Sequence, residues 1–306
     1  MSVASVPHEI RAARLADYTT FALGGPCRAL WTCTTPDQLQ QTVCALQAQA
    51  TPYLLIGGGS NLLVDDAGID TVVVRFFSDE PTIEWAGTTV TVSGATRLDH
   101  LAGATAAAGL AGVVCGSGIP GTVGGAIVGN AGAFGQQIGD VVETVECLAP
   151  DGSSLTLSRD ELGFAYRTSN LRHRQLVVLR ARLRLTAADA AALEQERADI
   201  LALRRAKHPD WRTEPCIGSI FRNIEPSSAA GRRQAAGWFL EQAGAKDLRV
   251  GGAFVYPRHA NIIVRRPEGT AHDVKELAAR MQAVVRAQFG FDLQYEVTFI
   301  GDFTKQ

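Results

Sequence analysis

Several features are missing from this 306-residue sequence, and each absence removes a class of protein. No excess of positive charge exists, since 29 Lys and Arg oppose 31 Asp and Glu, so there is no basic field for nucleic acid or an anionic membrane. No uninterrupted apolar run reaches the length of a membrane span. The cysteines, at positions 27, 33, 44, 115, 147 and 216, show no C-x-x-C or other paired spacing. That scatter favours reduced thiols over a disulfide framework, and we expect a cytoplasmic protein.

Two common site motifs are also absent. No G-x-x-x-x-G-K-[ST] occurs, which excludes a P-loop. The histidines, at positions 8, 100, 173, 208, 259 and 272, show neither H-x-x-x-H nor H-E-x-x-H spacing. We therefore expect no metal site.

Glycine is what the sequence has in abundance, above all in residues 116–135, GSGIPGTVGGAIVGNAGAFG. Flexible linkers combine glycine with serine and charge, whereas here the intervening residues include Ile119, Val123 and Phe134. This backbone is therefore expected to be ordered and largely buried. Glycine in such a place permits a positive φ or a close approach of main-chain N–H groups to an anionic ligand. Both a phosphate-bearing cofactor and a tight core turn remain possible, and we favour the cofactor.

Within this run, Gly116-x-Gly118-x-x-Gly121 satisfies the literal dinucleotide fingerprint. Pro120 and the pair Gly124-Gly125 argue against a helix starting there, so we disfavour a Rossmann site. A second glycine loop, 57–61, follows a short apolar strand at 53–56. Ligands of open α/β sheets bind at such strand ends, although a simple connecting turn would look the same.

The remaining pattern predicts an α+β protein with a domain boundary at His208-Pro209. Predicted helices begin at Thr35-Pro36, at the capping box Ser158–Glu161 and at Thr270, and cover 98–110, 187–207 and about 233–243. Predicted strands cover 27–34, 53–56, 62–64, 71–75, a hairpin at 82–93, 141–148, 154–157, 176–185, about 219–222, about 261–264 and 293–300.

Seven motifs occur together in the order of a known family. They are YTTF at 18–21 with GGP at 24–26, IGGGSNLLVD at 56–65, GIPGTVGGA at 118–126, NAGAFG at 130–135, FAYRTS at 164–169, GSIFRN at 218–223 and YEV at 295–297. From about Tyr18 to Ile300 the chain resembles the UDP-N-acetylenolpyruvoylglucosamine reductases, the flavoproteins that complete UDP-N-acetylmuramate for peptidoglycan. No single motif is decisive, but seven in register are very specific.

The resemblance implies a two-subdomain flavin fold of the PCMH/vanillyl-alcohol-oxidase type, followed by a C-terminal α/β substrate-binding domain. We expect FAD-binding subdomains at 1–77 and 78–207 and the substrate-binding domain at 208–292, with the strand at about 293–306 returning to the second subdomain. The resemblance further implies bound FAD and NADPH as the hydride donor. The FAD-binding residues would be Gly57, Gly58, Gly59, Ser60, Asn61, Gly118, Ile119, Pro120, Gly121, Thr122, Gly124, Gly125, Asn130 and Gly132.

Arg167, Ser219 and Glu296 occupy the family's three catalytic positions. Arg167 would bind the enolpyruvyl carboxylate, because a guanidinium matches planar oxygens. Ser219 would donate a proton to the carbanionic carbon, and Glu296 would stabilise the negative charge that develops on the carboxylate. From the residues alone, a surface ion pair, a turn serine and an outward strand residue are the competing interpretations.

For the UDP-sugar, the resemblance implies contacts from Tyr166, Arg167, Asn223, Lys246 and His259. The sequence departs from the family at Tyr256-Pro257-Arg258, where a small hydroxyl residue and a lysine are usual, and at Ile224, where proline is common. The short interval between Arg167 and Ser219 is similar to the subclass that lacks a tyrosine-bearing lid. His259 and Asn261 follow this departure within the substrate-binding segment.

The resemblance therefore implies an NADPH-dependent reduction of UDP-N-acetylglucosamine enolpyruvate, catalysed by a cytoplasmic monomer without nucleic-acid or membrane partners. A second hypothesis is a flavin oxidase or a paralogue with another nucleotide sugar, supported only by the departure at 256–258. A third is a nucleotide-binding module without chemistry, which the intact catalytic positions argue against.

Overall fold

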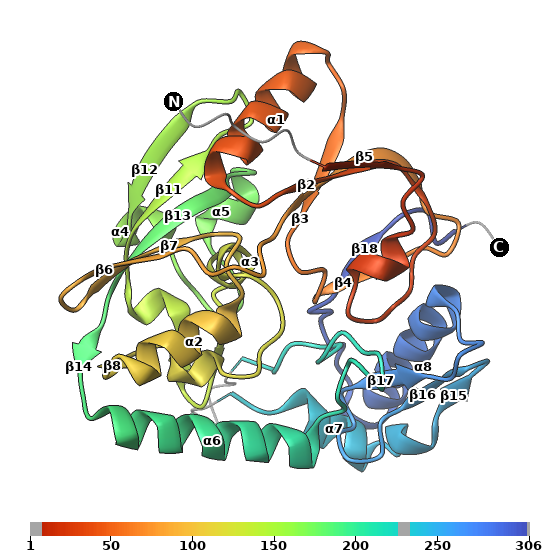
Figure 1. The fold of residues 1–306 in the computed structure, drawn as a ribbon. Coiled ribbons are helices and arrows are strands. Elements are labelled where there is room, and N and C mark those ends of the chain that lie inside the picture. Colours follow the sequence, from red (N-terminus) through yellow and green to blue (C-terminus); the bar gives the residue numbers. More distant parts are fainter. Residues whose placement is uncertain (1–7, 226–232, 305–306) are drawn as a thin grey trace. The chain divides into compact units, whose positions relative to one another are not determined.

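The computed structural model describes residues 8–225 and 233–304 (Figure 1). The outermost parts of the predicted first and last segments, 1–7 and 305–306, lie outside the described residues, as does 226–232 of the predicted substrate-binding domain. The chain divides into two units. Unit 1 holds the chain up to Ala12, Arg28–Gly58 and Thr71–Arg204; unit 2 holds Ala13–Cys27, Gly59–Asp70 and the chain from Arg205 onward. In the described ranges, no helix is both long and apolar enough to cross a membrane.

The first sheet of unit 1 has the strand order β1-β2-β5-β3, with β1 and β2 antiparallel and β3 and β5 parallel. Its strands are β1 (His8–Arg11), β2 (Cys27–Cys33), β3 (Tyr53–Ile56) and β5 (Ile69–Phe76). Helix α1 (Pro36–Ala48) connects β2 to β3 and begins as predicted: Thr35 accepts a hydrogen bond from the Gln38 N–H, and Pro36 occupies the first turn. Leu39, Val43 and Leu46 bury one face of α1 at helical spacing.

The second sheet of unit 1 is antiparallel, in the order β12-β11-β13-β7-β6. The predicted hairpin is confirmed as β6 (Ile83–Ala86) and β7 (Thr89–Ser93), and the other strands are β11 (Val142–Leu148), β12 (Ser154–Ser158) and β13 (Val177–Arg184). The alternation in β13 buries Leu183 while Arg182 and Arg184 face solvent and pair with Glu143 at 2.7 and 2.6 Å. The capping box at Ser158–Glu161 is confirmed at the start of α4 (Arg159–Leu162), and α5 (Asn170–His173) follows.

The glycine-rich run is ordered, as predicted, but it contains a helix where none was expected. Helix α2 (Leu98–Ala107) precedes it, and α3 (Val123–Val128) begins directly after Thr122, whose side chain accepts a hydrogen bond from the Gly125 N–H. The expectation that Pro120 and the glycine pair prevent a helix is therefore wrong. A Cβ on Gly124 would lie 3.1 Å from the Gly94 carbonyl oxygen, so a small residue lets α3 pack closely onto residue 94.

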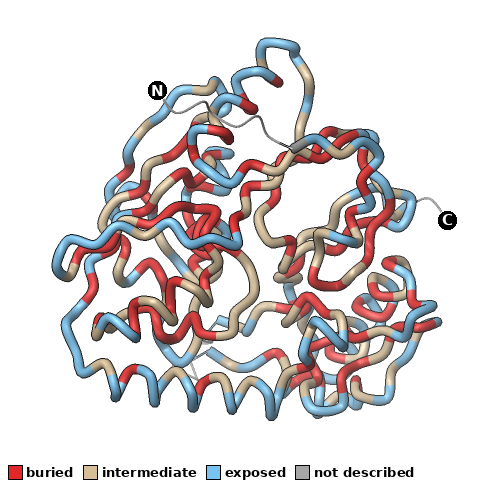
Figure 2. The backbone as a smooth tube through the Cα atoms, viewed as in Figure 1, coloured by how far each residue is buried: buried red, intermediate tan, exposed pale blue. Residues whose placement is uncertain are grey.

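Short strand pairs and one long helix complete unit 1. Strands β9 (Gly132–Ala133) and β10 (Gln136–Gln137) form one antiparallel pair, and β8 (Leu110–Ala111) and β14 (Thr186–Ala187) form another. Helix α6 (Ala190–Lys207) is exposed along most of its length, with only Leu193 and Ile200 buried (Figure 2). The boundary between the units falls inside α6, at Arg204, three residues before the predicted end of the second subdomain.

Unit 2 has a sheet in the order β15-β16-β17, formed by β15 (Arg249–Val250), β16 (Ala253–Val255) and β17 (Ile263–Arg265). Its helices are α7 (Ala236–Gln242) and α8 (Ala271–Phe289). Helix α8 begins at Thr270, as predicted, with a reciprocal capping box between Thr270 and Asp273, and Gly290 ends the helix in the left-handed conformation. Leu277, Met281 and Val285 of α8 are fully buried in the core of unit 2.

Two predicted strands of unit 2 differ in the structure. Residues 219–222 form no regular strand; Ser219 and Phe221 each make a single bridge, to different segments. The last strand is shorter than predicted, β18 (Thr298–Ile300), and pairs in parallel with β4 (Leu62–Val64) rather than with a strand of 78–207. Because 13–27 and 59–70 also belong to unit 2, residues predicted as one subdomain, 1–77, contribute to both units.

Candidate active site

The two predicted cofactor loops meet in unit 1. A Cβ on Gly57 would lie 2.7 Å from the Thr122 Oγ1, and a Cβ on Gly58 would lie 3.0 Å from the Gly121 Cα. Real side chains are essentially never found at the first distance, so a Cβ on Gly57 would displace the Thr122 side chain. Glycine at position 58 lets the two backbones come together. Gly57 directly follows β3, which brings the end of this parallel strand to the start of α3. The structure thus joins two glycine loops that are far apart in the sequence.

Several glycine N–H groups in this region already have protein acceptors. The Gly118 N–H donates to Asp99 Oδ1 at 2.8 Å, the Gly124 N–H donates to the Gly94 carbonyl at 2.9 Å, and the Gly125 N–H donates to Thr122 Oγ1 at 3.3 Å. These three glycines hold the loop and α3 in place. Close packing of the main chain is therefore their observed role.

Asn61, which is predicted to bind the cofactor, contacts the segment that contains Glu296, one of the three predicted catalytic residues. Its Nδ2 donates to the Glu296 carbonyl at 3.0 Å, and its carbonyl accepts from the Thr298 N–H at 3.0 Å. These bonds continue the pairing of β4 with β18. The second half of the 57–61 loop, from Gly59 onward, thus supports the backbone at Glu296 within unit 2.

Arg167 lies in unit 1 at the tip of a tight turn. Ala165 and Thr168 exchange both backbone hydrogen bonds, at 3.1 and 3.2 Å, and leave Tyr166 and Arg167 between them. The φ of Arg167 is +56°, in the left-handed region where a side-chain-bearing residue is strained by about 1 kcal/mol or more. Its guanidinium lies 5.7 Å from the centre of the Tyr166 ring and donates from Nη1 to the Gly132 carbonyl at 3.2 Å.

The Asn130 side chain anchors the turn formed by Ala165–Thr168. It is buried, with 2% of its surface exposed, and its Nδ2 donates to the Ala165 carbonyl at 2.9 Å and to Gln137 Oε1 at 3.0 Å. Its Oδ1 accepts from the Gly139 N–H at 3.0 Å. Asn130 was predicted as a cofactor residue, and in the structure its side chain positions the turn that carries Arg167.

Ser219 and Glu296 lie on neighbouring extended segments of unit 2. The Glu296 N–H donates to the Ile220 carbonyl at 2.8 Å, and the Phe221 and Tyr295 rings stack beside this bond at 5.1 Å between centroids. Ser219 and Glu296 are each half-buried, and Gly218, with a φ of +74°, turns the chain just before Ser219. The fold thereby brings these two predicted residues together, while Arg167 belongs to the other unit.

Asn261 fixes the Ser219 segment, a role that the sequence did not reveal. Its Oδ1 accepts from the Phe221 N–H at 3.0 Å, and its Nδ2 donates to the Phe221 carbonyl at 2.8 Å. The Ile220 N–H donates to the Asn261 carbonyl at 2.9 Å, and Asn261 is 2% exposed. A buried amide that satisfies both backbone groups of one residue locks that residue in place. Its presence in the predicted substrate segment was the only available signal.

Lys246 and His259 lie in unit 2, where the charge of Lys246 affects the pKa of His259. Lys246 pairs with Glu241 at 2.5 Å. Burial lowers the pKa of His259, and the nearby charges of Lys207 and Lys246 lower it further. The Asn261 N–H donates to His259 Nδ1 at 3.3 Å, which leaves Nε2 as the nitrogen that carries the proton of the neutral ring.

Asn223 and the departure at Tyr256-Pro257-Arg258 have local roles. Asn223 Oδ1 accepts from the Ala236 N–H at 3.2 Å, at the start of α7. Arg258 donates to the Arg205 and Ala206 carbonyls at 3.4 and 3.2 Å and also to the Tyr256 hydroxyl. A cation at the C-terminal end of α6 satisfies carbonyls that lack helical partners. The unusual Tyr–Arg pair therefore fixes the end of this helix.

Candidate metal ligands do not gather anywhere in the described residues: no group of three or more His, Cys, Asp or Glu side chains is close enough to hold an ion. Within the same ranges all six cysteines are free, and only Cys44 is exposed.

Comparisons with known proteins cover nearly the whole chain. A model of an FAD binding domain matches residues 27–158, and a model of the UDP-N-acetylenolpyruvoylglucosamine reductase C-terminal domain matches residues 209–300. A reductase of that name from Solibacter usitatus is 36% identical, with 98% of this chain and 100% of the relative covered. One from Clostridium botulinum is 32% identical, over 95% of this chain and 92% of the relative.

A solved structure agrees with the sequence comparisons. The crystal structure of UDP-N-acetylenolpyruvylglucosamine reductase from Thermus caldophilus covers 96% of this chain and 99% of its own, with a TM-score of 0.78 at 32% identity. Together with the two domain models, this confirms the predicted fold class, a flavin-binding fold followed by a C-terminal domain. The chain belongs to the UDP-N-acetylenolpyruvoylglucosamine reductase family.

Proposed function

We propose that Arg167, Ser219 and Glu296 are the residues with which this enzyme performs its family's reaction. The protein is an FAD-dependent oxidoreductase that uses NADPH to reduce UDP-N-acetylglucosamine enolpyruvate to UDP-N-acetylmuramate, in peptidoglycan precursor synthesis. Bound FAD supplies a carrier that takes a hydride from NADPH and gives it to the substrate. The observation that carries our assignment is the hydrogen bond from the Glu296 N–H to the Ile220 carbonyl, which places Glu296 beside the Ser219 segment.

The contact of Gly57 and Gly58 with Gly121 and Thr122 fits the cofactor's pyrophosphate. Two negative phosphates need several main-chain groups at close range, and a Cβ on Gly57 or Gly58 would push the two loops apart. We assign these four residues to direct contact. We propose Gly59, Ser60, Asn61, Ile119, Pro120, Asn130 and Gly132 as further FAD-binding residues. Gly118, Gly124 and Gly125 hold the loop and α3 in place through the hydrogen bonds described above.

Arg167 binds the carboxylate of the enolpyruvyl group in this proposal. A guanidinium presents two parallel donors to a carboxylate, and its positive charge stabilises the negative charge that builds toward that group during reduction. The tight turn and Asn130 hold Arg167 in its strained conformation before substrate arrives. Because the Arg167 backbone is already fixed, less conformational entropy is lost when the side chain binds the substrate.

Ser219 delivers the proton that balances the reaction. The vinyl bond gains a hydride at its terminal carbon and a proton at the adjacent carbon, and the Ser219 hydroxyl supplies that proton. Glu296 donates a hydrogen bond from its protonated carboxyl to the developing acid group in this proposal. Asn261 keeps the Ser219 segment fixed against its neighbours.

The UDP-sugar is bound by Tyr166, Asn223, Lys246 and His259 in the same proposal. Lys246 supplies a cation for the diphosphate, and the protonated Nε2 of His259 supplies a donor nearby. We further propose a monomer that works in the cytoplasm, with FAD-binding subdomains at 1–77 and 78–207 and a substrate-binding domain at 208–292. Its buried free cysteines suit a reducing compartment.

An anaerobic two-step titration tests this function. NADPH should bleach the flavin absorbance of the purified protein, and UDP-N-acetylglucosamine enolpyruvate should then restore it. A colourless protein that takes up no FAD would favour a nucleotide-binding module without chemistry. Reoxidation by oxygen or by a different nucleotide sugar, but not by this substrate, would favour an oxidase or a specialised paralogue.

A further inference from the structure

We propose that Asp99 and Arg197 form a positioning pair for the glycine-rich loop, in which the Asp99 carboxylate fixes the Gly118 N–H. The inference rests on the proposed role of residues 118–122 at the cofactor. Neither residue belongs to the motifs that identify the family, and both lie in unit 1.

One carboxylate oxygen carries both interactions. Asp99 Oδ1 accepts from the Gly118 N–H at 2.8 Å and from Arg197 Nη2 at 2.7 Å. The Asp99 and Arg197 side chains are only 30% and 23% exposed, so solvent screens the pair less than it screens a surface ion pair. Asp99 also lies in the first turn of α2, where the helix dipole favours a negative charge. Asp99 is therefore held in one orientation from two sides.

Side chains of helix α6 pack against Gly118. Arg197, Leu201 and Arg204 follow one another at spacings of four and three, and thus share a face of α6. A Cβ on Gly118 would lie 2.9 Å from both the Leu201 Cδ2 and the Arg204 Cδ. The φ of Gly118 is +70°. The side chains of α6 therefore leave the loop at Gly118 no room to move toward α6. On the other side, the hydrogen bond to Asp99 holds this loop against α2.

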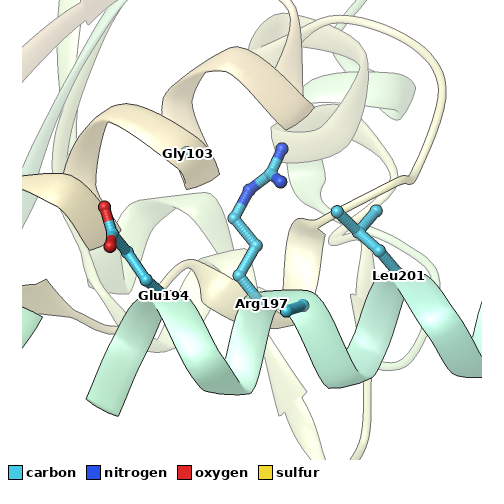
Figure 3. Close-up of a pocket in the computed structure, with 5 residues that line it drawn as sticks. Gly103, Glu194, Arg197 and Leu201 are labelled. Carbon is cyan, nitrogen blue, oxygen red and sulfur yellow. The ribbon is translucent and has the colours of Figure 1, made fainter. Parts of the chain in front are cut away.

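Arg197 reaches Asp99 by crossing α2 at a glycine. Figure 3 shows the Arg197 side chain extending from α6 toward Gly103 of α2, at a pocket that Glu194 and Leu201 also line. A Cβ on Gly103 would lie 3.3 Å from Arg197 Nε, which is closer than most side chains tolerate. Arg197 Nε is buried and makes no hydrogen bond among the described residues, and the hydrogen bond of the guanidinium to Asp99 comes from Nη2.

The effect reaches the cofactor loops through the first turn of α2. The Leu98 N–H donates to the Gly121 carbonyl at 3.0 Å, while Asp99 holds Gly118 three residues earlier. Both ends of the 118–121 turn are thus fixed by consecutive residues of one helix. Gly121 is the residue against which Gly58 packs. Asp99 and Arg197 thereby set the position of the surface that we assign to the phosphates.

The experiment measures FAD affinity of the apoprotein by quenching of flavin fluorescence, and apoprotein stability by thermal unfolding. Asp99→Ala should raise the Kd for FAD about tenfold to a hundredfold, as expected for loss of a charge-assisted hydrogen bond that orders the loop. Asp99→Asn retains an acceptor oxygen for Gly118 and should recover most of that loss. Arg197→Ala should weaken FAD binding, and the double alanine variant should be no weaker than Asp99→Ala alone.

Glu194→Gln is the matched control, because it removes a carboxylate from α6 at the same pocket. It should leave the Kd unchanged. A parent protein that binds FAD while Asp99→Ala binds it within twofold as tightly would overturn the positioning role. An equally large Kd increase in Asp99→Ala and Asp99→Asn would also overturn the positioning role. That result would mean that the charge of the ion pair matters, and not the acceptor oxygen that Asp99 offers to the Gly118 N–H. A parent protein that binds no FAD would instead refute the proposed function, and this inference with it.

Discussion

Adding one methyl group at Gly58 should weaken FAD binding far more than adding one at Gly125. In Gly58→Ala the new Cβ would lie 3.0 Å from the Gly121 Cα, whereas nonbonded carbons prefer about 3.5–4.0 Å. The two loops must therefore separate by roughly half an ångström. Overpacking of this kind costs about 1–3 kcal/mol. The apoprotein relieves it by letting the loops move apart, but the bound state needs them together, so the cost should appear as about a 5- to 150-fold higher Kd for FAD.

Gly125→Ala adds the same methyl group to α3 at an ordinary contact, 3.5 Å from Thr122 Oγ1. Alanine is favoured over glycine inside a helix by roughly 0.5–1 kcal/mol, so this variant should unfold at an equal or higher temperature. Titration of both apoproteins with FAD, followed by flavin fluorescence, gives the two dissociation constants. Equal values for Gly58→Ala and Gly125→Ala would refute the idea that the contact between the loops is the phosphate cradle.

Four further predictions address the chemistry and the fold. Ser219→Ala should leave flavin bleaching by NADPH nearly intact and slow reoxidation by substrate by orders of magnitude in stopped flow; equal loss in both steps would remove Ser219 as proton donor. Asn130→Asp loses the Nδ2 donor to the Ala165 carbonyl, and should destabilise the protein by about 1–3 kcal/mol and raise the substrate KM more than the Kd for FAD; an unchanged KM would contradict a role in positioning the Arg167 turn. The pKa of His259 is lower in the folded than in the unfolded protein, so stability should be complete above about pH 6.5 and fall as the pH drops through that value toward the folded pKa, a loss that thermal unfolding of His259→Gln should lack. Native protein should react rapidly with Ellman's reagent at Cys44 alone, because the other cysteines are buried; two or more fast thiols would contradict the described core.

Helix starts and the order of the glycine-rich run could be predicted well because their signals are local. Thr35 and Thr270 each cap a helix through a backbone group three residues away, so the residues that decide the structure are neighbours in sequence. The density of glycine in 116–135 likewise identified an ordered loop. The same local reasoning failed at α3, because packing of Gly124 against residue 94 stabilises a helix that glycine propensity disfavours.

Pairing over long distances could not be predicted. Residues 219–222 have an apolar strand pattern, but their partners on either side belong to segments near 261 and 295, and each pairing lasts only one residue. The partner of β18 is β4, although no local pattern distinguishes β4 from other short apolar strands. Register and partner choice depend on loop closure and burial summed over the whole unit, which no sequence window contains.

The sequence by itself determined the chemical inventory of this protein: two glycine-rich loops, an arginine, a serine and a glutamate in family motifs, and helices with clear caps. Only the tertiary structure decided what each residue does there. It assigned Asn130 to the Arg167 turn, Asn261 to the Ser219 segment and the Gly118 N–H to Asp99. The physical reason is that a polar group buried away from water must find a hydrogen-bond partner within the protein. Which partner is in reach is decided only when distant segments of the chain have packed together.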